Sequence, residues 1–224
     1  MAETINWLLL QLADSAFPAG GFAHSAGLEA ALQLGEVQRT PESIEAWCRE
    51  LVQTTGTASL PFVNSAMRAP ERFAEWDRLN DAFLSNHVAR AASRVQGRAF
   101  FSTCCQSFPG GELTALRERV RSERLTQHFA PVFGVVCAHL RISLEHARQV
   151  FMYLAVRGAL SAGVRLNALG PCAAQQLQVF LAFDMDRVLD ETAHLDAHSA
   201  TQSAPLLELF QMHHDRLYSR LFQS

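Results

Sequence analysis

The side chains most capable of chemistry in this chain of 224 residues gather in one short segment, residues 14–29. His24 and Ser25 are adjacent there, Glu29 follows four residues later, and a proline and a pair of glycines precede them. Glycine opens backbone angles that are closed to other residues, and proline fixes the approach to a turn. We predict that the chain re-enters a helix near Ala23, with His24 and Ser25 in the first turn.

Three interpretations of this segment compete. His24 as base and Ser25 as nucleophile would make a hydrolase, but adjacent residues rarely reach the required geometry, and no G-x-S-x-G motif surrounds the serine. A helix-capping loop with a buried histidine is the plainest alternative. We favour a recognition loop for another protein, because loops held by a rigid scaffold carry many binding sites.

The composition excludes several classes of function. All nineteen basic residues are arginine, so the chain lacks the lysine of a P-loop nucleotidase, a Schiff-base enzyme or a protein kinase. The net charge of -3 argues against a nucleic-acid partner. With 49% hydrophobic and 18% charged residues, the chain can bury a sizeable core. It shows neither a signal sequence nor a run of 18 apolar residues, so we expect no membrane segment and a cytoplasmic location.

The metal-binding residue types lack the spacing of a metal site. No C-x-x-C pair occurs among the five cysteines, which we expect to be reduced thiols: Cys48, Cys104, Cys105, Cys137 and Cys172. His194 and His198 are spaced to chelate on one helix face, and 213–214 is a histidine pair, but no third ligand accompanies them. We therefore expect no tight metal site, no cofactor and no catalytic residue. A helical metal-dependent enzyme using these histidines, or a helical oligomer of purely structural use, remains the alternative.

Apolar residues recur with helical spacing nearly throughout, beginning with Ile5, Leu8, Leu9 and Leu12. We predict helix starts at Thr40-Pro41, Pro70, Ser143 and Gly170-Pro171. We also predict a clear helix break at 109–111 and a less definite boundary at Pro131. No segment alternates as a strand would. We predict an all-α fold in which residues 1–224 form a single compact helical bundle of about ten helices.

The last helix-forming stretches suggest two further features. The helix that starts at Pro171 should pass through Val188, and residues 177–183 are apolar on more than one of its faces; burial in the monomer core is slightly favoured over a dimer interface. Residues 197–204 are small and polar, which predicts a mobile connector. The following segment, 205–224, retains aromatic and arginine residues, and we weigh a partner-docking tail equally with a last helix folded onto the core.

Both ends of the chain resemble one family, the urease accessory protein UreF. The N-terminal match is LLQLADSAFPAGGFAHSAGLE at 9–29, where family members carry a leucine-rich helix, a proline-glycine turn and then aromatic-x-His/Trp-Ser-x-Gly-Leu-Glu. The C-terminal match is YSRLFQS at 218–224, and the blocks GALSAGVRL at 158–166 and AAQQL at 173–177 also look like family signatures. The resemblance therefore spans essentially the whole chain.

The resemblance implies an all-helical, dimeric, cytoplasmic protein that is not an enzyme. Such proteins form a complex with the accessory protein UreD, also called UreH, and the nickel-carrying GTPase UreG. The complex delivers nickel to the urease apoprotein, and nickel is expected to be handled by the complex through an internal passage. Arg165 stands where some relatives carry lysine, which exchanges a compact ammonium for a planar guanidinium. If the position regulates the GTPase, the resemblance does not carry its fine tuning over to this chain.

We expect the two ends to carry the partner contacts and the tail to fold near the loop, so that both form one platform for the GTPase. Phe22 would anchor a partner pocket, Gly27 would permit close approach, and Arg220 would reach a carboxylate or carbonyl with Tyr218 beside it. The expected partner-binding residues are Phe22, His24, Ser25, Gly27, Glu29, Arg165, Tyr218, Ser219, Arg220, Leu221 and Phe222.

Overall fold

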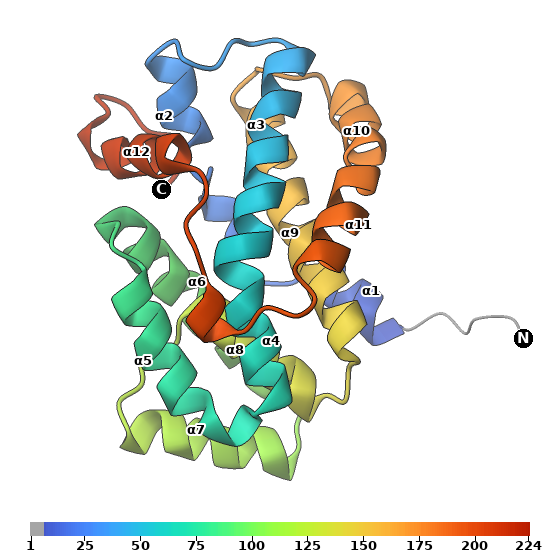
Figure 1. Cartoon of the computed structure of the whole chain (residues 1–224). Coiled ribbons are helices and arrows are strands. Elements are labelled where there is room, and N and C mark those ends of the chain that lie inside the picture. The colour runs from blue at the N-terminus through green and yellow to red at the C-terminus, as the bar shows by residue number, and fades with distance from the viewer. Residues whose placement is uncertain (1–6) are drawn as a thin grey trace, which may run out of the picture.

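The structure is a computed structural model that describes residues 7–224, and over this range it contains helices and turns but no β-strand. The helices are α1 (Trp7–Ala13), α2 (Leu28–Gln33), α3 (Pro41–Thr54), α4 (Leu60–Arg68), α5 (Phe73–Phe83), α6 (His87–Ser107), α7 (Gly111–Ser122), α8 (Phe129–His139), α9 (Leu144–Arg165), α10 (Pro171–Phe180), α11 (Ala182–Glu191) and α12 (Pro205–His213). Helix α3 runs into α4 through a π-turn, and α10 runs into α11 almost without a break (Figure 1). Counted with these two pairs joined, the described residues form ten helical segments. The predicted all-α bundle of about ten helices is confirmed. No helix within the described range is long and apolar enough to cross a membrane.

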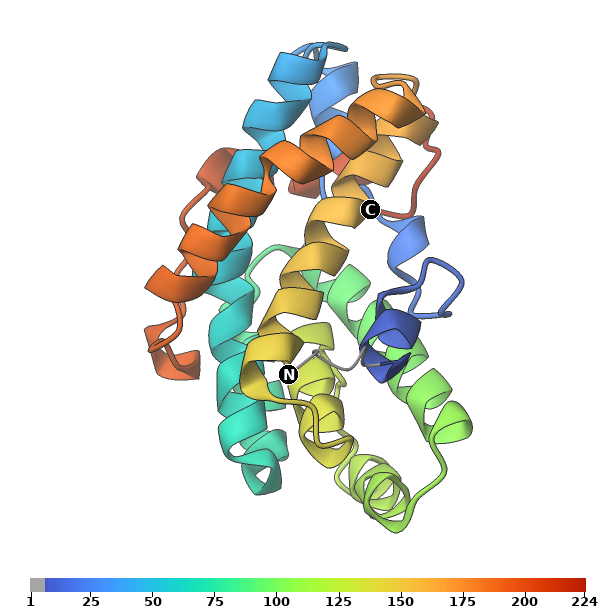
Figure 2. The same cartoon turned by 90° about the vertical axis from the view of Figure 1, so that its right-hand side faces the viewer.

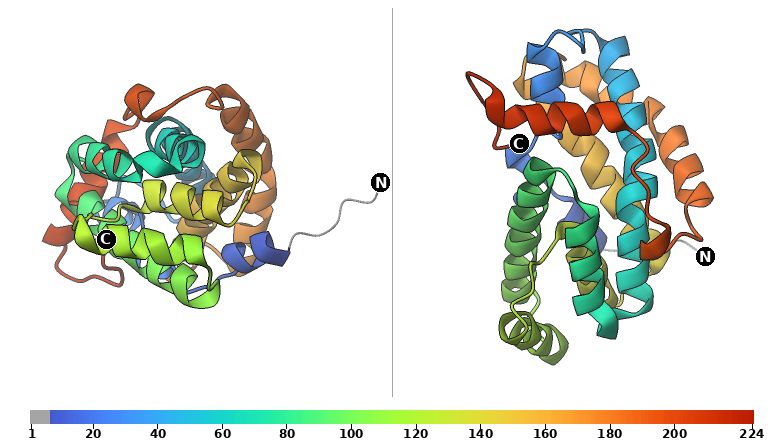
Figure 3. Two further views of the ribbon diagram at one scale, coloured as in Figure 1. Left: turned by 90° about the horizontal axis from the view of Figure 1, so that it is seen from below. Right: turned by 60° about the vertical axis from the view of Figure 1, so that its left-hand side comes forward.

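Helix α8 lies inside the bundle because it is apolar on every face. All of residues 129–137 are buried, and a helix that is apolar all round must pack on several sides. It crosses α4 closely, since a Cβ on Gly134 would lie 2.7 Å from the carbonyl oxygen of Val63. The ring of Phe133 stacks on that of Phe100 from α6 at 5.2 Å. Helix α7 lies across one end of this core (Figures 1 and 3).

Side-chain caps set the helix starts that the sequence predicts. Thr40 accepts a hydrogen bond from the backbone N–H of Ser43 and α3 begins at Pro41, while Ser143 caps α9 in the same way. A 3₁₀ turn that begins at Pro70 leads into α5, and the break at 109–111 separates α6 from α7. These predicted boundaries are confirmed.

The prediction for residues 171–188 is partly wrong. The expected single helix ends at Phe180 and restarts at Ala182 as α11. Val179, Phe180 and Phe183 are 72%, 62% and 77% exposed, so burial in the core is wrong for these three side chains. A helix on the outside of a bundle has one buried stripe, and Leu177, Leu181 and Val188 take it here. The predicted stripe on the first helix is seen from Leu8 onward, because Ile5 lies outside the described residues.

The segment 197–204 is tied to the helices it passes. The backbone N–H of Ala197 donates to Ser65 Oγ at 2.8 Å, and that of Thr201 donates to the carbonyl oxygen of Thr57 at 2.9 Å. Ala197 and Ala204 are buried at its two ends. The segment is therefore anchored to α4 and the π-turn, and its mobility stays a prediction.

Candidate partner-docking site

The last residues of the chain lie on the N-terminal turn. The backbone N–H of Gln223 donates to the carbonyl oxygen of Ala23 at 2.8 Å, and that of Ser25 donates to the carbonyl oxygen of Ser224 at 2.5 Å. Figures 2 and 3 show the C-terminal end beside the N-terminal segment, while α12 lies across α2 and α6. The predicted proximity of tail and loop is confirmed.

The carboxylate of Glu29 fixes the tail. Its Oε1 accepts from the backbone N–H of Leu221 at 2.7 Å, and its Oε2 accepts from the backbone N–H of Phe222 at 3.1 Å and from His214 Nε2 at 3.0 Å. Both Glu29 and His214 are buried. A buried carboxylate is tolerated only when hydrogen-bond donors surround it. Here all three donors belong to the tail, His214 in its 3₁₀ turn and Leu221 and Phe222 near its end.

Gly27 allows α12 to approach the turn. Its φ angle is 86°, and a Cβ at this position would lie 2.9 Å from the backbone nitrogen of Gln211. The element that approaches Gly27 closely is the chain's own helix α12, and the predicted approach of a partner at this residue stays a prediction. Ala26 also has a positive φ of 52°, so a right-handed helix cannot include these two residues. The prediction of a helix from Ala23 is therefore wrong, and α2 begins at Leu28 after a short 3₁₀ turn at 21–23.

His24 and Ser25 do not form a base and nucleophile. Ser25 is fully buried, and its hydroxyl donates to the carbonyl oxygen of Ser224 at 3.1 Å and accepts from the backbone N–H of Glu29 at 3.4 Å. His24 Nδ1 instead shares a hydrogen bond of 2.6 Å with Ser224 Oγ. Burial and the neighbouring charge of His214 lower the pKa of His24. Both side chains hold the tail in place.

Arg165, at the end of α9, joins the two chain ends. Its guanidinium carbon lies 3.7 Å from the ring centroid of Phe22 and 4.2 Å from that of Phe222. Its Nη1 also donates to the carbonyl oxygen of Phe22 at 2.5 Å. A planar guanidinium stacks on aromatic faces in a way that an ammonium cannot. The guanidinium of Arg165 therefore links α9 to the N-terminal turn through Phe22 and to the tail through Phe222.

Five of the expected partner-binding residues remain on the outside of this junction. We call them the docking face: Phe22, Tyr218, Ser219, Arg220 and Leu221, all of them exposed. Tyr218 extends fully into solvent, and the guanidinium of Arg220 has no hydrogen bond or ion pair to any residue in 7–224. Ser25, Gly27, Glu29 and Phe222 are buried behind this face, so a direct contact between them and a partner would require the tail to move.

Comparison with known proteins agrees with the resemblance of the ends. The UreF family model matches residues 38–182. "Urease accessory protein F" of Arabidopsis thaliana is 37% identical over 227 residues, covering 100% of this chain and 94% of that protein. "Urease accessory protein F" of Oryza sativa subsp. indica is 37% identical over 96% of this chain and 84% of its own length, and "Urease accessory protein UreF" of Arthrobacter sp. is 30% identical over 100% and 99%. The chain belongs to the UreF family.

Two adjoining pockets of about 240 and 610 Å³ lie behind the docking face of this UreF-family chain. Their common wall is made of His24, Ala26, Leu51, Thr55, Ser59, Gln96, Phe129 and Phe151. Two of these residues, Thr55 and Ser59, bound the π-turn between α3 and α4, a feature that often marks functional sites. Sequence analysis missed both the pockets and the π-turn, because neither leaves a local signal.

His214 is a buried residue of the junction whose place the sequence did not reveal. The sequence shows 213–214 only as a histidine pair without a third metal ligand, whereas His214 is buried against Glu29. His194 and His198 do not lie on one helix, since α11 ends at Glu191 and His198 belongs to a 3₁₀ turn. Within residues 7–224 no group of three or more histidine, cysteine, aspartate or glutamate side chains is arranged to hold a metal ion.

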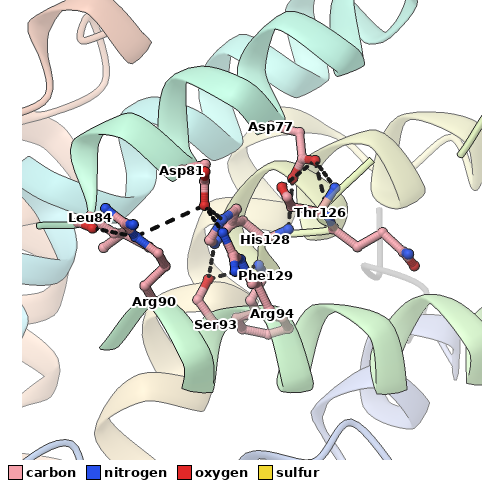
Figure 4. A network of polar contacts seen from close by, with 10 residues as sticks. Asp77, Asp81, Leu84, Arg90, Ser93, Arg94, Thr126, His128 and Phe129 are labelled. Carbon is pink, nitrogen blue, oxygen red and sulfur yellow. Dashed lines mark hydrogen bonds and ion pairs between the residues drawn. The ribbon is translucent and has the colours of Figure 1, made fainter. Parts of the chain in front are cut away.

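A second polar cluster, away from the chain ends, holds the start of α8 (Figure 4). Ser93 Oγ lies 3.1 Å from His128 Nδ1, and His128 Nε2 lies 2.9 Å from Asp81 Oδ1, an order of groups found in hydrolases. Here, however, the hydroxyl of Ser93 accepts from the backbone N–H of Phe129, the first residue of α8. The cluster therefore acts as a cap that α5 and α6 supply to α8.

Proposed function

We propose that this UreF-family chain is a non-catalytic adaptor in urease maturation. Family membership and the names of its relatives, "Urease accessory protein F" and "Urease accessory protein UreF", support a role in that process. The observation that carries the adaptor role is the junction of the two chain ends. Buried polar contacts hold the tail rigidly, while an aromatic residue and a free guanidinium are left exposed, and tyrosine and arginine supply much of the energy of protein interfaces.

In this proposal the docking face binds the GTPase UreG, and other surfaces bind UreD/UreH and the urease apoprotein in the cytoplasm. The chain modulates the GTPase and brings no nucleotide chemistry of its own, in keeping with the absence of lysine. It acts as a homodimer, and neither nucleic acid nor membrane is a partner. Nickel is the cargo of the complex, with no cofactor and no tight metal site in this chain.

The two adjoining pockets support a passage for that cargo. They share the wall that contains His24, and together they reach from the side chains of α12 to those of α1, α9 and α10. The shared wall offers one imidazole among hydroxyl, amide and apolar groups, so a passing ion would find too few ligands to be held. The interpretation fits a chain that handles nickel without storing it.

Co-expression tests the proposed function. Cells that carry the urease subunits and the other accessory proteins should release ammonia from urea only when this chain is also present. Equal urease activity with and without the chain would contradict a role in maturation.

Variants of the docking face test the adaptor role separately. Arg220→Ala and Tyr218→Ala remove exposed side chains, so they should abolish capture of UreG by the complex while leaving helix content unchanged. They are sharper than deletion of residues 218–224, which would also uncover the buried carboxylate of Glu29. Arg121→Ala on α7 is the matched control, because that arginine is also exposed. Unaltered capture of UreG by both docking-face variants would discard the face.

A further inference from the structure

Arg220, whose guanidinium is free on the docking face, is held through the backbone on both of its sides by α2. The backbone N–H of Leu221 donates to Glu29 Oε1 at 2.7 Å, and the carbonyl oxygen of Ser219 accepts from Gln33 Nε2 at 3.0 Å. Glu29 and Gln33 are four residues apart, so they lie on the same face of the helix. One face of α2 therefore supports the backbone from which Arg220 projects.

The two supporting side chains differ in how much depends on them. Glu29 is buried and binds two further groups of the tail, so its removal affects the tail as a whole. Gln33 is exposed. Its bond to Ser219 is the only hydrogen bond that residues 218–220 make within the described part of the chain. The position of this short loop therefore depends on one exposed side chain.

The orientation of Arg220 matters because of the way a guanidinium recognises its partner. Its planar set of donors binds a carboxylate through two parallel hydrogen bonds, and this geometry requires a defined direction of approach. A loop that moves freely must first be ordered when a partner binds, and this ordering reduces the affinity. A loop that is already held in place avoids that cost.

We propose that Gln33 is a positioning residue of the docking face, which holds Ser219 so that the guanidinium of Arg220 meets a carboxylate of the partner in a fixed orientation. The identity of that partner, the GTPase UreG, rests on the proposed function. The hydrogen bond from Gln33 is exposed and neutral, and such a bond stabilises a conformation only modestly. Its loss leaves the fold intact and weakens binding of the partner, because the loop is then ordered only during binding.

Replacing Gln33 by a side chain of similar length without a donor tests this role. In the complex of the full chain with UreD/UreH, Gln33→Met should weaken the affinity for UreG roughly two- to tenfold while urea unfolding is unchanged. Gln38→Met is the matched control, because the side chain of Gln38 is also exposed and bonds to no residue in 7–224. Arg220→Lys keeps the charge but lacks the planar donors, so in that background Gln33→Met should change the affinity by less than about twofold.

A measurement on the chain alone follows the loop directly. The heteronuclear NOE of the Arg220 amide reports fast backbone motion, and it should fall in Gln33→Met but not in Gln38→Met. That of Phe222, which Glu29 holds, should stay high in both variants. An unchanged NOE at Arg220, or an equal loss of affinity with and without Arg220→Lys, would overturn the positioning role.

The same binding assay separates this role from the proposed function. If Arg220→Ala weakens capture of UreG and Gln33→Met does not, the positioning role alone is wrong. Unaltered capture in Arg220→Ala contradicts the docking face itself, and the positioning role is then overturned with it.

Discussion

Glu29 shows how one side chain can decide the state of a whole segment. Its carboxylate accepts hydrogen bonds from two backbone N–H groups of the tail and from the imidazole of His214. Glu29, His214 and Phe222 are buried, while Leu221 is half exposed. Removing it leaves three donors without an acceptor. An unsatisfied buried group costs about 1–3 kcal/mol, and partial exposure of the tail reduces the total.

Glu29→Ala should therefore destabilise the chain by roughly 2–4 kcal/mol and release the tail first. Urea unfolding measures the first effect. Hydrogen exchange at the amides of Leu221 and Phe222 measures the second, because these amides lose their acceptor. Glu36→Ala, an exposed glutamate in the same region, is the control. Slow exchange of both amides in Glu29→Ala would show that other contacts hold the tail.

Two histidines, His24 partly buried and His128 buried, make stability depend on pH. Burial, together with the charge of His214, lowers the pKa of His24; burial also lowers the pKa of His128, against the opposing hydrogen bond from Asp81. The unfolded chain then binds more protons than the native chain once the pH falls below about 6.5. The free energy of unfolding should be level above that pH and should decrease as the pH is lowered further.

Urea unfolding at a series of pH values between about 7.5 and 5.5 checks this expectation. His24→Asn should flatten the decrease, since one of the two titrating groups is gone. His146→Asn should not, because that side chain is exposed. A free energy of unfolding that rises on acidification would contradict the direction of both shifts.

At the scale of the helices, the crossing of α4 and α8 is one of the tight constraints. A Cβ on Gly134 would approach the carbonyl oxygen of Val63 to 2.7 Å, and neither backbone can move without shifting the core. Gly134→Ala should cost about 1–3 kcal/mol, as overpacking in a core does. Gly158→Ala in α9 is the matched control, because its Cβ would meet nothing within 4 Å.

The control should stabilise the chain by about 0.5–1 kcal/mol, since alanine is the better helix former. Thermal unfolding of the two variants measures the difference. Equal melting temperatures would mean that α4 and α8 can separate at no cost, contrary to the close packing of protein interiors.

The helices also show where sequence reasoning succeeds. Local chemistry determines helix starts, and the caps at Thr40 and Ser143 were predicted because the capping residue and the first turn are adjacent in the chain. The exposure of Phe180 and the burial of His214 were not predicted, because both depend on packing against elements that are distant in sequence. The junction of the two ends was predicted from their composition. The contact between Glu29 and His214 within it was not, because the two residues lie 185 positions apart and leave no local pattern.

At the scale of the whole molecule, the outer face of α10 and α11 departs from what a monomer needs. Val179, Phe180 and Phe183 are each more than three-fifths exposed on consecutive turns. Clustered exposed apolar side chains mark interaction sites in soluble proteins. With burial in the core ruled out for these residues, the dimer interface considered from the sequence is the remaining interpretation, and we propose it for this face.

Phe180→Glu combined with Phe183→Glu should convert a dimer to a monomer, because two buried charges facing their symmetry mates would be unpaired across a two-fold interface. Light scattering coupled to size-exclusion chromatography gives the mass directly. Leu206→Glu on α12 is the control, since that side chain is also apolar and exposed but lies on another face. If the unaltered chain is already monomeric, the interface is wrong. If only Leu206→Glu dissociates the dimer, the two-fold axis passes by α12, and the docking face then lies beside the interface and not apart from it.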